Sequence, residues 1–149
     1  MKKRVLIFSG NHARHIFINK TFLDFDIEIA VILMKREDLI PVIDEDLKII
    51  DKENMKKHFQ ERYIKEKEKF GFFNSNEEIK KIFKKNKLIE CDPDYLNSQT
   101  TLNFVQDFNP DFVFIFGVNM IKSPVIENLP IETINLHLGL SPWCKGSAT

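Results

Sequence analysis

The feature that most constrains the fold is a pair of short apolar runs near the N-terminus, separated by a glycine turn and a helical stretch. Residues 4–8 and 27–33 consist almost wholly of Val, Leu, Ile, Ala and Phe. Such runs, without polar alternation, are typical of strands buried on both faces of a parallel sheet. Gly10 lies in the turn after the first run, where we expect a backbone conformation that other residues resist. This order predicts a Rossmann-like, doubly wound α/β fold, with a mostly parallel sheet and helices on both faces.

The remaining pattern continues this arrangement. A helix is expected at 12–22, with Ile16, Phe17, Ile18 and Phe22 as its packing residues. Further strands are predicted at 87–90, 112–116 and 133–136, and further helices at 97–107 and 125–128. The run 112–116 is the most hydrophobic and is expected at the centre of the sheet. We interpret 1–149 as one domain, incomplete at its C-terminal end.

Residues 35–87 form a charge-rich insertion in this plan. Apolar residues recur at helical spacing in 51–70 and again in 76–85. Such a pattern indicates amphipathic helices. Solvated helices packed on the edge of the sheet are the favoured interpretation, and a lid or interface over a site is the alternative.

Composition excludes several classes of protein. The chain has 43% hydrophobic and 30% charged residues, and its formal net charge is zero, so nothing favours nucleic acid as a partner. Its two cysteines have no spacing suited to a zinc site or a disulfide framework. No apolar run approaches the ~20 residues of a membrane span. We expect a cytoplasmic protein without a membrane association, and the possibility of a homodimer stays open.

Polar residues follow two of the predicted strands. Asn135 and His137 lie at the end of the last strand, two residues apart, and are expected to point to the same side. They combine a hydrogen-bond donor with a group that titrates near neutral pH. A satisfied polar pair is the plainer alternative, but the following loop, which contains Pro142 and Gly146, favours a site.

The turn after the first strand supplies a second candidate. Asn11 and Arg14 lie where phosphate-bearing ligands often meet the start of a helix, and Arg14 could bind a phosphate through two hydrogen bonds. A solvated first helical turn is an equally good interpretation. His12 and His15 are spaced to share a metal ion, but no third ligand is nearby in the sequence, so no metal site is predicted.

Several segments together resemble the N-terminal catalytic domain of the 10-formyltetrahydrofolate-dependent formyltransferases. They are Asp111 to Gly117, Leu129-Pro130, Ile134-Asn-Leu-His137, Leu140-Ser-Pro142 and Lys145-Gly146. The resemblance is close over 87–149 and loose over 1–33. The combination in this order is specific, whereas Asn-x-His alone is not.

The resemblance implies transfer of a formyl group from 10-formyltetrahydrofolate, the co-substrate, to a primary amine. His137 would transfer a proton or stabilise the tetrahedral intermediate, and Asn135 would donate a hydrogen bond to its oxyanion. The loop containing Gly117, Val118, Met120 and Ile121 would form the wall that binds the pterin, and Leu140 would add apolar contact.

The family also has a catalytic aspartate in a loop after the next strand, which this sequence does not reach. By chain order Asp92, Asp94, Asp107 and Asp111 cannot be that residue. We therefore expect catalysis to be incomplete within these 149 residues. An inactive fragment or binding module of the same fold is the alternative.

The amine substrate is inferred by elimination. Ser9-Gly10-Asn11 is similar to the phosphate loop of glycinamide ribonucleotide formyltransferases, but His12 to His15 depart from it. The Thr-Pro pair and basic second domain of initiator-tRNA formyltransferases are not seen. Leu138 stands where folate-hydrolysing relatives tend to have a second histidine. The loop 138–142 looks like that of sugar-modifying members, so a phosphate-bearing amine, an amino-sugar nucleotide, is expected.

Overall fold

The computed structural model describes residues 1–36, 45–71 and 76–137. Its strands are β1 (Arg4–Gly10), β2 (Glu28–Met34), β3 (Lys87–Cys91), β4 (Phe112–Phe116) and β5 (Thr133–Asn135). Its α-helices are α1 (Ala13–Asn19), α2 (Ile49–Phe70), α3 (Asn76–Ile82) and α4 (Gln99–Phe108). Short 3-10 helices are η1 (Lys20–Asp24), η2 (Pro93–Tyr95) and η3 (Ile126–Asn128).

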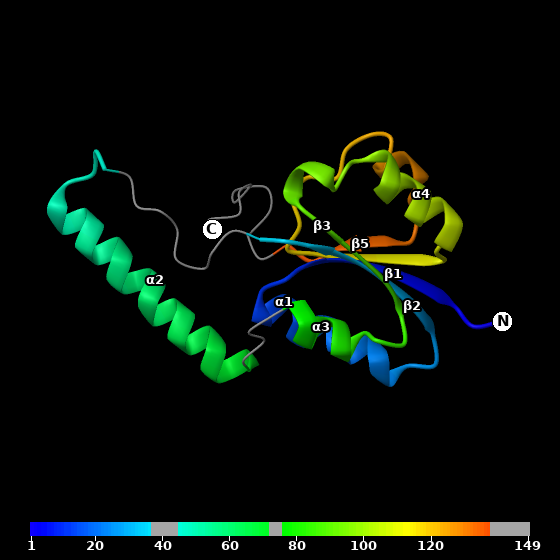
Figure 1. Cartoon of the computed structure of the whole chain (residues 1–149), viewed down its shortest axis with the longest axis horizontal. Coiled ribbons are helices and arrows are strands. Elements are labelled where there is room, and N and C mark those ends of the chain that lie inside the picture. The colour runs from blue at the N-terminus through cyan, green and yellow to red at the C-terminus, as the bar shows by residue number, and fades with distance from the viewer. Residues whose placement is uncertain (37–44, 72–75, 138–149) are drawn as a thin grey trace.

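The five strands form one sheet in the order β3-β2-β1-β4-β5, and every pairing is parallel (Figure 1). The predicted Rossmann-like, doubly wound α/β fold is confirmed. The prediction of the central strand is wrong, because β1 pairs with β2 and β4 and occupies the middle. Hydrophobicity alone did not identify the centre: β4 is interior, but three of its five residues are only partly buried.

Helices cover both faces of the sheet, and each face has its own apolar core (Figure 1). Alternate strand residues point to opposite faces, so each buried strand contributes to both cores. The core beneath α4 contains Leu6, Phe8, Ala30, Ile32, Met34, Leu96, Leu102, Val105, Phe108, Val113, Ile121 and Val125. The core beneath α1 and α3 contains Val5, Ile7, Ile16, Ile29, Val31, Leu33, Ile79 and Phe83.

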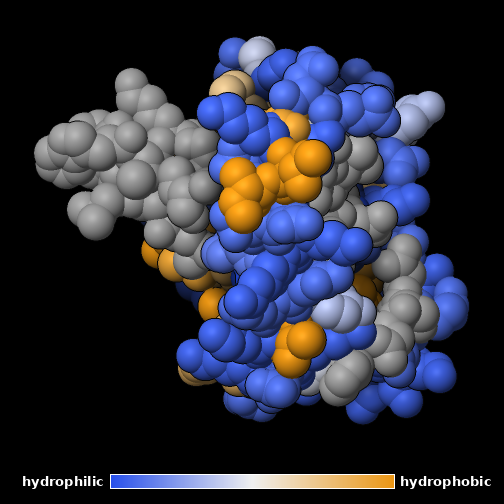
Figure 2. All heavy atoms as spheres, turned by 90° about the vertical axis from the view of Figure 1, so that its left-hand side faces the viewer, coloured by the Kyte–Doolittle hydropathy of each residue, from blue (hydrophilic) through white to orange (hydrophobic). Residues whose placement is uncertain are grey.

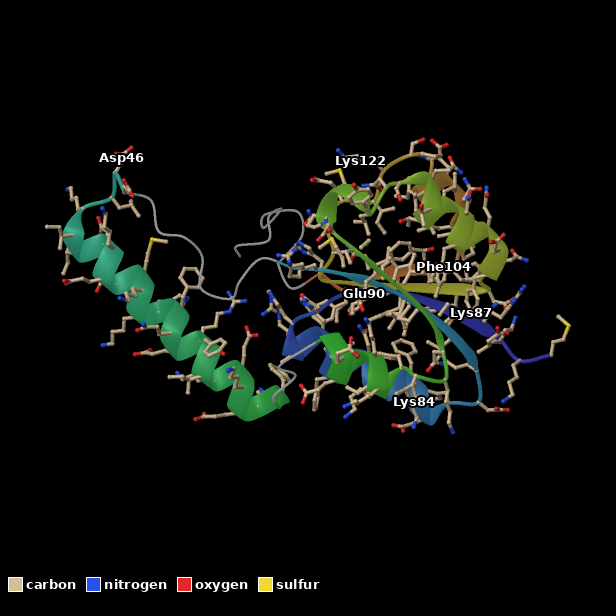
Figure 3. All side chains as sticks on the ribbon, in the orientation of Figure 1. Asp46, Lys84, Lys87, Glu90, Phe104 and Lys122 are labelled. Atoms are coloured by element: carbon tan, nitrogen blue, oxygen red, sulfur yellow. The ribbon has the colours of Figure 1, made fainter. Side chains whose placement is uncertain are left out.

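Local sequence explains where helix α4 begins and ends. Ser98 is its N-cap, and the Ser98 side chain accepts a hydrogen bond from the Thr101 backbone N–H, as capping serines do. Asn109 ends the helix in the left-handed conformation, with φ 47°. Phe104, between these ends, packs from α4 onto the core below it (Figure 3).

The first helix differs from its prediction. The α-helix ends at Asn19 and continues as η1. Among its predicted packing residues, Ile16 is buried and Phe22 packs against the same core. Ile18 is only partly covered, and Phe17 is 47% exposed because it faces α2 rather than the sheet.

The helices of the charged insertion behave differently from each other. Helix α3 packs on the sheet through Ile79 and, just beyond its end, Phe83. Helix α2 does not pack on the edge of the sheet, contrary to the favoured interpretation: it extends away from it, and Asp46 marks its far end (Figures 1 and 3). Glu66 is its only buried residue, so apolar burial contributes little to its position.

No helix within the described ranges is both long enough and apolar enough to cross a membrane.

Candidate functional site

The topology places a switch point between the carboxyl ends of β1 and β4. From β1 the chain proceeds outward to β2 and β3, and then it returns to the other side of β1 to form β4 and β5. In open α/β sheets, ligands bind outside the carboxyl ends of the strands where the order reverses in this way. The turn after Gly10 and the turn at Gly117 flank this switch point.

Two glycines at the switch point make room for a histidine. A Cβ on Gly10 would lie 2.5 Å from the Gly117 carbonyl oxygen and 2.5 Å from His15 Nδ1. A Cβ on Gly117 would lie 2.3 Å from the His15 ring. The expectation that Gly10 needs an unusual backbone conformation is wrong. Gly117 has the positive φ, 75°, and Gly10 is needed because the backbones and ring approach so closely.

The imidazole of His15 is buried at the centre of this site. Only 2% of the residue is exposed, its ring contacts Phe116 edge-on at 4.6 Å, and the His12 ring stacks on it at 5.4 Å. Burial lowers the pKa of His15 to about 2, and the positive charges of Arg14, His12 and Arg36 act in the same direction. The Gly10 backbone opposes them without offsetting them. His15 is therefore neutral at physiological pH.

Side chains cross-link the ends of three strands. Asn11, after β1, accepts a hydrogen bond of 2.9 Å from the backbone N–H of Arg36, after β2. The Arg36 guanidinium donates one of 3.3 Å to Asn119, after β4. The Asn119 backbone N–H donates to the sulfur of Met34 at 3.5 Å. Asn11 thus lies at the switch point, as predicted, but its carbonyl oxygen has a structural partner.

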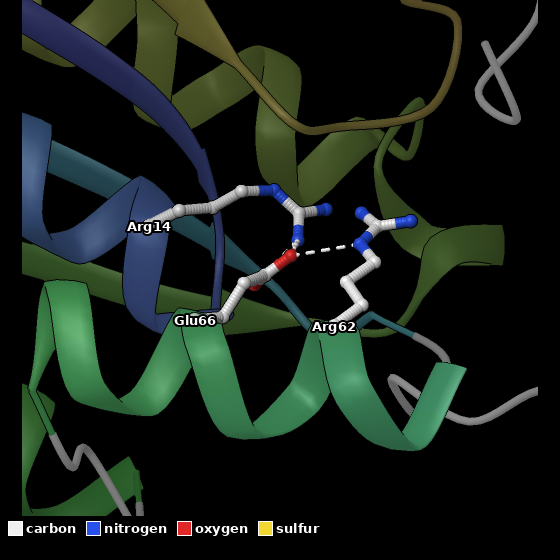
Figure 4. Close-up of polar contacts among 3 residues, drawn as sticks. All are labelled: Arg14, Arg62 and Glu66. Carbon is white, nitrogen blue, oxygen red and sulfur yellow. Dashed lines mark hydrogen bonds and ion pairs between the residues drawn. The ribbon is translucent and has the colours of Figure 1, made fainter. Parts of the chain in front are cut away.

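The predicted phosphate-binding residue Arg14 forms an ion pair with Glu66 (Figure 4). Its Nη1 lies 2.6 Å and 2.7 Å from the two carboxylate oxygens of Glu66, and Arg62 Nε lies 2.9 Å from one of them. Burial alone raises the pKa of Glu66, but the hydrogen bonds from Arg62 and Arg14 outweigh it and lower the pKa. Arg14 Nε is buried and has no hydrogen-bond partner among the described residues. The Arg14 side chain is thus not solvated, whereas the alternative interpretation of this turn supposed that it would be.

The predicted catalytic pair, Asn135 and His137, lies at the end of the sheet that the carboxyl ends of β1 and β4 form. Asn135 pairs in register with Ile115 of β4, and the Leu136 N–H donates to the Ile115 carbonyl at 2.9 Å. Continuing this register by two residues aligns His137 with Gly117. Both Asn135 and His137 are exposed to solvent.

The predicted pterin wall is only partly accessible. Gly117 and Val118 are partly buried at the end of β4. Met120 is 75% exposed, whereas Ile121 is 8% exposed and packs within the core beneath α4. Only the backbone of Ile121 could therefore contact a ligand. Leu140 lies outside the described residues.

A small polar cavity adjoins Asn11 at the ends of β1, β2 and β3. Its volume is about 130 Å³, and it is lined by Asn11, Leu33, Lys35, Glu90, Cys91 and Asp92. Binding pockets for whole organic ligands usually measure about 300–1,000 Å³, so this cavity suits one ring or polar group. Burial, with a smaller effect of Asp92, raises the pKa of the Cys91 thiol to about 11, so this thiol is protonated at neutral pH.

Sequence reasoning missed the residues that organise this edge: His15 as a buried ring, Arg36, Asn119 and Glu66. Arg36 and Asn119 could have been found by their places just after predicted strands. Glu66 carried no such signal, because its partner Arg14 is 52 residues away in the sequence.

In comparisons with known proteins, no family model matches the chain and no curated protein matches it. The class of the protein is defined by its fold alone, which is a five-stranded, all-parallel, Rossmann-like α/β fold. A particular activity has to be argued from the site residues.

Proposed function

We propose that this chain belongs to the machinery of formyl transfer from 10-formyltetrahydrofolate to a primary amine carried by an amino-sugar nucleotide. The observation that carries the proposal is the position of Asn135 and His137. They lie two residues apart at the carboxyl end of β5, next to the Gly117 turn. Folds of this class bind ligands at this end of the sheet, outside the carboxyl ends of the strands. The sequence around them resembles that of the formyltransferases.

The reaction requires chemistry that these two groups can supply. The amine nitrogen attacks the formyl carbon, which gives a tetrahedral intermediate with a negatively charged oxygen. The bond from carbon to folate N10 then breaks, the amine loses a proton and N10 gains one. The Asn135 amide can donate a hydrogen bond to the oxyanion, and the His137 imidazole can carry the proton.

Two features of the described site support a phosphorylated sugar as the amine carrier. Arginines and histidines gather around the switch point, where Arg14, His12 and Arg36 all act electrostatically on His15. The cavity beside Asn11 is lined by Asp92, whose carboxylate can accept hydrogen bonds from sugar hydroxyls. Its other acidic lining residue, Glu90, forms an ion pair of 2.9 Å with Lys80.

The test measures folate binding and formyl transfer separately. The chain is titrated with 10-formyltetrahydrofolate, and release of tetrahydrofolate is then followed with an amino-sugar nucleotide, glycinamide ribonucleotide or methionyl-tRNA as the amine. We expect these 149 residues to bind the folate, and we expect transfer to the amino-sugar nucleotide from a protein that also supplies the catalytic aspartate. Asn135→Ala should lower kcat by about 10²–10³, the usual cost of losing one oxyanion donor, with unchanged thermal unfolding.

Two results would contradict the proposal in different ways. Folate binding without transfer to any amine, even from a protein that supplies the catalytic aspartate, would favour the binding module. If the chain has the far-UV circular dichroism of a folded α/β protein but binds no folate, both the formyltransferase hypothesis and the binding-module hypothesis would be excluded.

A further inference from the structure

We propose that Arg14 and Arg62 form the binding site for a phosphate-type oxyanion, and that Glu66 occupies this site in the ligand-free chain. Binding of the oxyanion would displace the carboxylate of Glu66 and bridge Arg14 of α1 to Arg62 of α2 in its place. This inference rests on the proposed function in one respect: it assigns the phosphate of the amine substrate to these two arginines.

Glu66 occupies the arginine site without matching it. Both carboxylate oxygens bond the same nitrogen of Arg14, Nη1, while the buried Nε has no partner among the described residues (Figure 4). A guanidinium is planar, and it binds an anion best when two of its nitrogens each donate a hydrogen bond to a different oxygen. A phosphate group has at least three acceptor oxygens, so it can bond Nε and an Nη group together and still reach Arg62.

The charge of the cluster also favours a divalent anion. Two guanidinium groups face one carboxylate, which leaves one positive charge. A phosphate carries a charge of about −1.5 to −2 at neutral pH and would compensate both arginines. Arg36 adds to the positive potential, because its charge acts on the adjacent His15.

There is space for a ligand beside Glu66. An open hollow of about 350 Å³ lies along α2, and its basic lining residues are Arg62, Lys65 and Lys69. Glu61 and Glu66 are its acidic lining residues. All the described residues that line this hollow belong to α2, and Arg14 is not among them, so the hollow gives a ligand access to Arg62 and Glu66 from solvent.

Helix α2 is attached weakly enough to respond. Its one buried residue is Glu66, and the ring of Phe70 contacts Phe17 at 5.4 Å near the same end. Ile49, Ile50 and Ile64 are 77%, 59% and 54% exposed. The side of the molecule on which α2 extends is mostly hydrophilic, with separate apolar patches (Figure 2). Elements with few buried apolar contacts are those that open most readily.

The test uses the whole chain and inorganic pyrophosphate at constant ionic strength. Calorimetric titration should show binding to the wild-type chain. Glu66→Gln should bind more than about tenfold tighter, which corresponds to about 1.4 kcal/mol, because the competing carboxylate is gone. Glu68→Gln, an equal charge change at an exposed position of the same helix, is the matched control and should leave the affinity unchanged. Arg14→Gln should weaken binding by a similar factor.

Hydrogen exchange of the wild-type chain gives a second measurement that requires no variant. Pyrophosphate should slow exchange of the α2 amides, because it would bridge Arg14 of α1 and Arg62 of α2 with more negative charge than Glu66 supplies. Equal affinities of Glu66→Gln and Glu68→Gln, or an α2 exchange rate that pyrophosphate leaves unchanged or accelerates, would overturn the inference and assign Glu66 a purely structural role. Failure of folate binding or formyl transfer would leave both measurements interpretable, so the two proposals can fail independently.

Discussion

The buried imidazole of His15 should make the protein lose stability in mild acid. Its pKa is lowered from 6.5 to about 2 in the folded chain. Below pH 6.5 the unfolded chain therefore binds a proton that the folded chain does not bind, and stability falls as pH falls. The slope is about 1.4 kcal/mol per pH unit, so His15 alone should remove about 3 kcal/mol between pH 7.5 and 4.5. Much of a small domain's total stability, about 5–15 kcal/mol, could be lost in this way.

The assay is urea unfolding at a series of pH values, followed by circular dichroism. His15→Gln removes the titrating group, so its stability should fall less steeply with pH by the amount just given, whatever its stability at neutral pH. His58→Gln changes an exposed histidine on α2 and should retain the wild-type slope. Parallel curves for the wild type and His15→Gln would refute the reasoning, as would an NMR titration in which the His15 ring gains a proton near pH 6.

Other residues give further testable expectations. Gly117→Ala should destabilise the fold by more than about 1–2 kcal/mol, the cost of a left-handed backbone for other residues, because its Cβ would also meet the His15 ring; equal stability of the variant in urea unfolding would contradict this. Ser98→Ala should lower the free energy of unfolding by about 1 kcal/mol, because it removes the cap of α4. Gln99→Ala, which leaves that cap in place, is the control in thermal unfolding. Phe83→Ala should cost about 3–5 kcal/mol, because the ring is fully buried beneath the sheet. A smaller loss, measured by urea unfolding, would mean that the α3 segment is not packed there.

Much of the fold could be predicted because buried parallel strands and capped helices are local patterns. The run 27–33 and β2 differ by one residue at each end, and the expected start at 112 and end at 116 are those of β4. The helix predicted at 97–107 matches α4 to within two residues at its start and one at its end, and Ser98 is its cap. These features depend on hydrophobicity and hydrogen bonding within a few neighbouring residues, which the sequence displays directly.

The order of the strands was not available in the same way. The sequence favoured 112–116 as the central strand because that run is the most hydrophobic, but β1 occupies the centre. Centrality depends on which strands pair, and pairing is decided by the crossover connections and by what covers each face.

In the candidate site, too, some features were determined by the sequence and others only by the tertiary structure. Sequence alone determined that Asn11 and Gly117 would follow strands and that Asn135 would lie at the end of one. All three therefore reach the same end of a parallel sheet, since all the strands point the same way. Only the tertiary structure decided that Arg14 would pair with Glu66 and that His15 would lie between two glycine backbones. Both depend on close approaches between segments far apart in the chain, whose distances come from packing rather than from any local pattern.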